Sequence, residues 1–104
     1  MRFCPWYPLA EADAHAPAGE GVLQVRIADG LIEYPRGKSA MVHYEHAQDV
    51  RAAAVAFAGL PHAVDLLARH LEIEPGETVS YAEFHAKLCA EFVRRFGAPP
   101  GGVP

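Results

Sequence analysis

Cysteine and positive charge are both scarce in this sequence. Cys4 and Cys89 are the only two cysteines among 104 residues, and they lie far apart. Two isolated cysteines are typical of reduced thiols in a cytoplasmic protein and argue against a scaffold built on disulfides. Nine Lys and Arg residues stand against thirteen Asp and Glu residues, so the formal net charge is −4. This balance disfavours a broad surface for the nucleic-acid backbone.

The sequence also lacks a long uninterrupted apolar run. The apolar N-terminal stretch MRFCPWYPL is broken by Pro5 and Pro8 and continues directly into EADAH. It therefore has neither the apolar region of a secretory signal nor the length of a membrane span. We expect a cytoplasmic protein without a membrane segment.

What is present predicts one globular domain. Apolar residues make up 51% of the chain and charged residues 21%, a balance that favours a packed core over disorder. A chain of 104 residues suits a single domain. We expect an N-terminal strap rich in proline and aromatic residues (1–20), a core (21–97) and a flexible tail (98–104).

Strand patterns occupy the first half of the core. Val22–Ile27 alternates imperfectly with period two, and a turn with the sequence Ala-Asp-Gly follows it. We expect Leu31–Tyr34 to return beside Val22–Ile27 as a hairpin. Ser39–His46 is predicted to form a third, more buried strand.

Helical patterns occupy the second half. Asp49–Phe57 places apolar side chains on one helical face, and His62–Leu71 is predicted to be a second helix. A third helix begins at Ser80, which forms a capping box with Glu83. The predicted fold class is therefore α/β (α+β), a small three-stranded antiparallel sheet flanked by about three helices.

Four short segments stand out along the chain. They are GVL at 21–23, HYE at 43–45, AQDVR at 47–51 and FGAPPGG at 96–102. Over roughly residues 17–57, and at the end of the last predicted helix, the chain resembles the GIY-YIG nucleases. The resemblance implies a small antiparallel sheet flanked by helices, in agreement with the periodicity.

The resemblance also implies a set of site residues, most of which are replaced. In these nucleases two tyrosines and an arginine act on the scissile phosphate, and a glutamate holds a divalent cation. The matching positions here carry Leu23, His43 and Ala53. If activity is retained, the catalytic candidates are His43, Arg51, Tyr34 and Tyr44, with Glu91 as the ligand of Mg²⁺.

The sequence is compatible with three functions. The first is a catalytically degenerate GIY-YIG-like domain that binds a protein partner or itself and needs no cofactor. The second is a divergent endonuclease that uses Mg²⁺ to hydrolyse phosphodiesters. The third is a small DNA-binding module that uses Arg26, Arg36 and Lys38, which the hairpin would gather at one edge.

Overall fold

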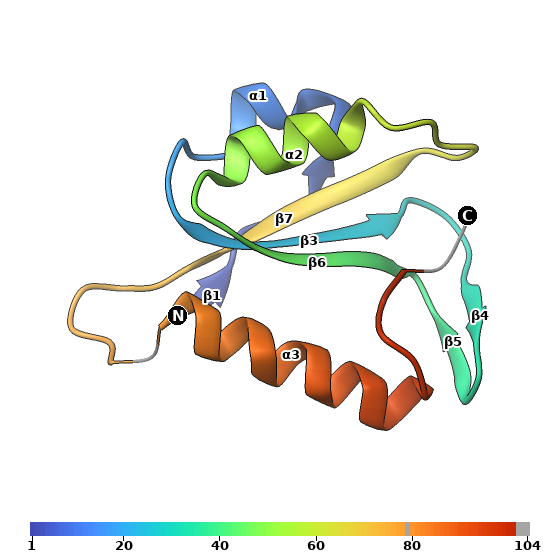
Figure 1. Ribbon diagram of the computed structural model, residues 1–104. Helices are drawn as coiled ribbons and strands as arrows, with labels where there is room; N and C mark the ends of the chain where they lie inside the picture. Colours follow the sequence, from blue (N-terminus) through green and yellow to red (C-terminus); the bar gives the residue numbers. More distant parts are fainter. Residues whose placement is uncertain (79, 102–104) are drawn as a thin grey trace.

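The computed structural model describes residues 1–78 and 80–101, and its centre is one antiparallel sheet (Figure 1). Three longer strands lie in the spatial order β7, β3, β6, and two short N-terminal strands pair with β7 on its other side. The bounds are β1 Arg2–Phe3, β2 Tyr7–Pro8, β3 Gly21–Ile27, β6 Met41–Ala47 and β7 Leu66–Glu72.

Helices cover both faces of this sheet. The short helix α1 (Ala12–His15), preceded by a 3-10 turn at Leu9–Glu11, lies beside α2 (Val50–Ala58) over one face. Helix α3 (Tyr81–Phe96) lies over the opposite face (Figure 1). We refer to the two sides of the sheet as the α2 face and the α3 face. The predicted fold class, a small α+β domain, is confirmed.

The middle strand β3 carries the core. Leu23 and Val25 are fully buried and pack against Val50 and Ala54 of α2. On its two edges β3 pairs with β6 and with β7, both in antiparallel register. Because successive strand residues point to opposite faces, this register decides which side chains of β6 and β7 can meet.

Two of the three predicted helices begin where expected, after Asp49 and after Ser80. The side chain of Asp49 accepts a hydrogen bond from the backbone of Ala52 and caps α2. The Ser80 hydroxyl accepts one from the backbone of Glu83 and caps α3. Each cap satisfies a backbone N–H that has no partner inside its helix.

The prediction of a helix at His62–Leu71 is wrong, because most of this segment forms β7. The apolar residues of this segment fit both the helical and the strand period. Val64, Leu67 and Leu71 recur at helical spacing, whereas Leu66 and Ala68 alternate as in a strand. The alternation prevails because β3 offers an open edge on which β7 forms its backbone hydrogen bonds. With β7 and the two short N-terminal strands, the sheet has five strands, against the three predicted.

The predicted hairpin between Val22–Ile27 and Leu31–Tyr34 is also wrong. β4 (Ile32–Tyr34) pairs with β5 (Gly37–Ser39) in a separate two-stranded sheet. The strand β4 cannot join β3, since both edges of β3 are occupied. The predicted strand Ser39–His46 is accordingly divided, with its first residue in β5 and the remainder, from Met41 onward, in β6.

Candidate functional site

The five predicted nuclease residues lie on two faces of the sheet. His43 and Tyr44 are neighbours on β6 and therefore point to opposite sides. The ring of His43 stacks on Phe57 of α2 with 4.4 Å between ring centroids. The ring of Tyr44 meets Phe92 of α3 edge-on at 5.6 Å. The sheet thus separates the candidates into two groups.

The hollow beside His43 corresponds to the positions that the resemblance implies. His43 and Ala53, which match the second tyrosine and the arginine of the nucleases, both line it, together with Glu45 and Phe57. Its volume is about 340 Å³. His43 Nε2 forms a 2.8 Å hydrogen bond with Glu45 Oε1. The hollow holds a histidine and a carboxylate, but its arginine position carries only a methyl group.

Arg51 does not supply the missing charge to this hollow. Its Nε donates a 2.8 Å hydrogen bond to the carbonyl oxygen of Ala16, just after α1. Its backbone N–H donates to Pro17. Arg51 therefore fastens α1 to the start of α2. Leu23, at the position of the first tyrosine, is fully buried in the core and has no access to a substrate.

The second group, Tyr34, Tyr44 and Glu91, lies on the α3 face. Tyr34 also meets Phe92 edge-on, and its hydroxyl donates a 2.6 Å hydrogen bond to the carbonyl oxygen of Met41. Tyr44 and Glu91 line a hollow of about 180 Å³. Burial raises the pKa of Tyr44 to about 12, so its phenol stays protonated at neutral pH.

Glu91 is engaged in an ion pair on its own helix. Arg94 Nε donates a 2.9 Å hydrogen bond to Glu91 Oε2, and this hydrogen bond lowers the pKa of the Glu91 carboxyl. His43 lies on the opposite side of the sheet, so the two cannot share an ion. In the described residues, no three His, Cys, Asp or Glu side chains come together in a group that could hold a metal.

Arg26, Arg36 and Lys38 each contact a different set of groups. Arg36 donates to the carbonyl oxygens of Val93 and Arg94 and so caps the C-terminal end of α3. Lys38 lies 3.9 Å from the carboxylate of Glu33. The hairpin that was expected to gather the three cations does not form, and each of them has a separate environment.

Arg26 belongs instead to a stack of arginine and aromatic side chains that the sequence did not predict. Its guanidinium lies 4.7 Å from the centre of the Trp6 ring, and that of Arg69 lies 4.4 Å from the same ring and 4.3 Å from Phe3. Arg69 Nε also donates to Gln24 Oε1 at 2.8 Å. Burial lowers the pKa of Arg69, and the charge of Arg26 acts in the same direction. This stack fixes the N-terminal strap to the sheet.

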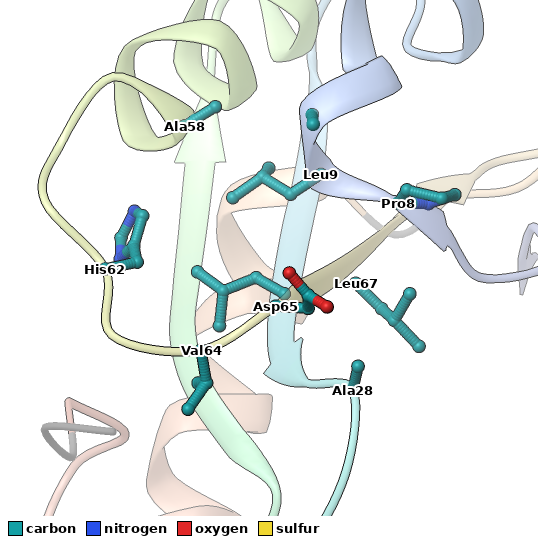
Figure 2. A pocket seen from close by; sticks show the side chains of 10 residues that line it. Pro8, Leu9, Ala28, Ala58, His62, Val64, Asp65 and Leu67 are labelled. Atoms are coloured by element: carbon teal, nitrogen blue, oxygen red, sulfur yellow. The ribbon is translucent and has the colours of Figure 1, made fainter.

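A second unpredicted feature is an apolar pocket of about 360 Å³ on the α2 face. It lies between the N-terminal segment, the end of α2 and the start of β7 (Figure 2). Its lining is mostly aliphatic, with two polar side chains, His62 and Asp65. In Figure 2 the carboxylate of Asp65 lies among the aliphatic side chains. This segment was predicted to be helical, and a helix here would not have indicated the pocket.

No family model matches the chain, and no curated protein or solved structure is significantly similar to it. Among residues 1–78 and 80–101, no helix is both long enough and apolar enough to cross a membrane.

Proposed function

We propose that this protein is a binding domain on a GIY-YIG-like core that has lost phosphodiester cleavage. The observation that carries the proposal is the hollow beside His43. His43 and Ala53, two of the positions matched to the nucleases, both line it, but Ala53 stands in place of the arginine and Arg51 is bound to Ala16. A phosphoryl transition state needs a cation for its developing charge, and the lining of this hollow contains neither Lys nor Arg.

The order of elements supports the proposed kinship. The segments that resemble the superfamily motifs form β3, β6 and the start of α2, and the two strands pair directly. Side chains that react with substrate are lost more easily than the packing of a core, because fold and activity depend on different residues. A degenerate descendant is the simplest account of both observations.

We propose that the binding surface is the apolar pocket of Figure 2. Leu9 and Leu66 are buried in its wall, whereas Val64 at its edge is 44% exposed and can contact a partner. Asp65 is exposed and takes part in no ion pair within the described ranges. An apolar wall with one unpaired carboxylate favours an aliphatic side chain with a basic end, such as that of a protein partner's lysine.

A cytoplasmic location is part of the proposal. Cys4 and Cys89 both carry free thiols, which suits a reducing compartment.

We expect the purified chain to leave supercoiled and branched DNA intact in the presence of Mg²⁺. A gel assay with a plasmid and a four-way junction would measure this, alongside a Glu91→Gln variant prepared in the same way. The two proteins should be indistinguishable. Cleavage by the parent chain that depends on Mg²⁺ and disappears in Glu91→Gln would establish the nuclease alternative and overturn the proposal.

We expect butylammonium to bind in the pocket and to shift the amide NMR signals of Ala58, Val64 and Leu66. The Asp65→Asn variant should bind it about two- to fivefold more weakly, because a partly exposed ion pair contributes up to about 1 kcal/mol. Asp13→Asn, which removes a charge on α1, is the matched control and should not change the affinity. Equal binding of butyrate, or signals shifted elsewhere, would refute this assignment of the pocket.

A further inference from the structure

A cysteine, a histidine and a glutamate form a connected chain at the edge of the sheet. Cys4 lies between β1 and β2, and its Sγ is 3.3 Å from His70 Nδ1 on β7. The other ring nitrogen of His70 is 3.5 Å from Glu72 Oε1. The pairing of β1 and β2 with β7 brings together residues that are 66 positions apart in the chain.

The contacts define how the imidazole carries its hydrogen. Glu72 accepts only, so the hydrogen belongs on His70 Nε2 and leaves Nδ1 as the acceptor. Nδ1 faces two donors, the Cys4 thiol and the Tyr7 hydroxyl at 3.2 Å. The backbone N–H of His70 donates to the Cys4 sulfur at 3.3 Å and would stabilise negative charge there. This is the arrangement of a nucleophile, a base and a group that orients the base.

The chain of side chains opens into a pocket of about 310 Å³. Cys4, Tyr7, His70 and Glu72 all line it, and Pro5 and Trp6 add an apolar wall. Cys4 is partly exposed, whereas His70 is 6% exposed, so the sulfur can be reached while the base behind it is shielded from water.

Both reacting groups are uncharged at neutral pH. Burial raises the pKa of the Cys4 thiol and lowers the pKa of the His70 imidazole. The other titratable groups near the pair are Glu72, Arg69, Tyr7 and His15. The carboxylate of Glu72 opposes part of the effect of burial on His70. A neutral thiol beside a neutral imidazole reacts by transferring its proton as the new bond forms, in the manner of a serine–histidine pair.

We propose that Cys4 is a nucleophile that accepts an acyl group from an activated ester or thioester. Sγ attacks the carbonyl carbon, and the thiol proton passes to His70 Nδ1. The carbon–oxygen or carbon–sulfur bond to the leaving group then breaks, and His70 returns the proton to that group. The products are an S-acyl Cys4 and a free alcohol or thiol. Glu72 is a positioning residue that holds the imidazole by Nε2, and Pro5 and Trp6 receive the apolar part of the acyl group.

The test uses p-nitrophenyl acetate with the full chain and follows both nitrophenolate release and peptide masses. Cys89 is an internal control, because its Sγ lies 3.4 Å from His85 Nε2 but the described part of the chain places no carboxylate beside that histidine. We expect Cys4 to be acetylated at least about tenfold faster than Cys89, since a positioned general base contributes about a hundredfold or more. Cys4→Ser should abolish the fast phase, and Cys89→Ser should leave it unchanged.

The dependence on pH separates this mechanism from ordinary thiolate chemistry. The acetylation of Cys4 should fall only below the lowered pKa of His70, where the imidazole can no longer accept a proton. Burial also raises the pKa of Cys89, so its rate should climb steadily with pH as thiolate forms. In Glu72→Gln the acid limb for Cys4 should move to lower pH, since the carboxylate that raises the pKa of His70 is gone.

His70→Gln is expected to slow the acetylation of Cys4 at least about tenfold. Its circular dichroism is compared with that of the parent chain, because His70 is buried; if it does not fold, the profiles of the parent and Glu72→Gln decide instead. Equal rates for Cys4 and Cys89 with parallel pH profiles would overturn the proposal. The result is independent of DNA cleavage and of amine binding, which test the proposed function.

Discussion

Replacing Phe92 with alanine is expected to lower the free energy of unfolding by about 3–5 kcal/mol. Phe92 is the only residue of α3 that is buried within the described part of the chain, with 4% of its surface exposed. Its ring contacts those of Tyr34, Tyr44 and Phe96 at centroid distances of 5.0, 5.6 and 4.6 Å. The substitution removes these contacts and leaves a cavity between α3 and the sheet.

Urea unfolding followed by circular dichroism would measure the loss, and near-ultraviolet signals of Tyr34 and Tyr44 would report the cavity directly. Val93→Ala is the matched control, because Val93 is the next residue on the same helix and is 39% exposed. It should change stability by no more than about 0.5 kcal/mol. If Phe92→Ala lowered the free energy of unfolding by less than about 1 kcal/mol, this would contradict the packing of α3 on the sheet.

The parts of the fold that were predictable are those whose signals are local. Asp49 and Ser80 mark the helix starts because each caps a helix with its own side chain. The alternation in Val22–Ile27 needs no knowledge of its partners to indicate a strand. Residues 66–71 were misassigned because their apolar spacing fits a helix and a strand equally well. Only the long-range pairing with β3 decides between the two.

That one error concealed most of the candidate sites. Arg69, His70 and Asp65 all lie on β7 or directly before it. Read as a helix, the segment places Arg69 and His70 beside each other on a solvated surface. Read as a strand, it sends Arg69 to the Trp6 ring and His70 to Cys4, on opposite faces. The alternation of LLARHLE was the signal that could have revealed both.

The split between His43 and Tyr44 was predictable in principle. The sequence assigned both residues to one strand, and adjacent strand residues cannot point into one site. What the sequence could not reveal is which of the two faces the hollow containing Ala53, since this depends on the side of the sheet to which α2 returns. His43 lies on the α2 face and lines one hollow with Ala53, and these are two of the three positions matched by the resemblance.

Leu23 is the position at which the proposed kinship and the packing of the core make opposite demands. The resemblance places a tyrosine there, but Leu23 is 0% exposed and packs in the core with Val50 and Ala54. Leu23→Ala is expected to lower the free energy of unfolding by about 2–5 kcal/mol, because it removes buried methyl groups and leaves a cavity. Leu31→Ala is the matched control, since Leu31 is 62% exposed, and should cost no more than about 0.5 kcal/mol.

Leu23→Tyr tests the proposed loss of catalysis at the same position. The larger ring has no room in this core, and its hydroxyl would be buried, so we expect a loss of about 1–3 kcal/mol from overpacking and no gain of DNA cleavage. Thermal unfolding and the plasmid assay measure the two effects on one sample. A Leu23→Tyr variant as stable as the parent would mean that the core still accommodates the tyrosine of the nucleases. If that variant also cut DNA with Mg²⁺, the hollow beside His43 would be a site silenced by one residue, and the separation of Arg51 and Glu91 from it would not be what prevents cleavage.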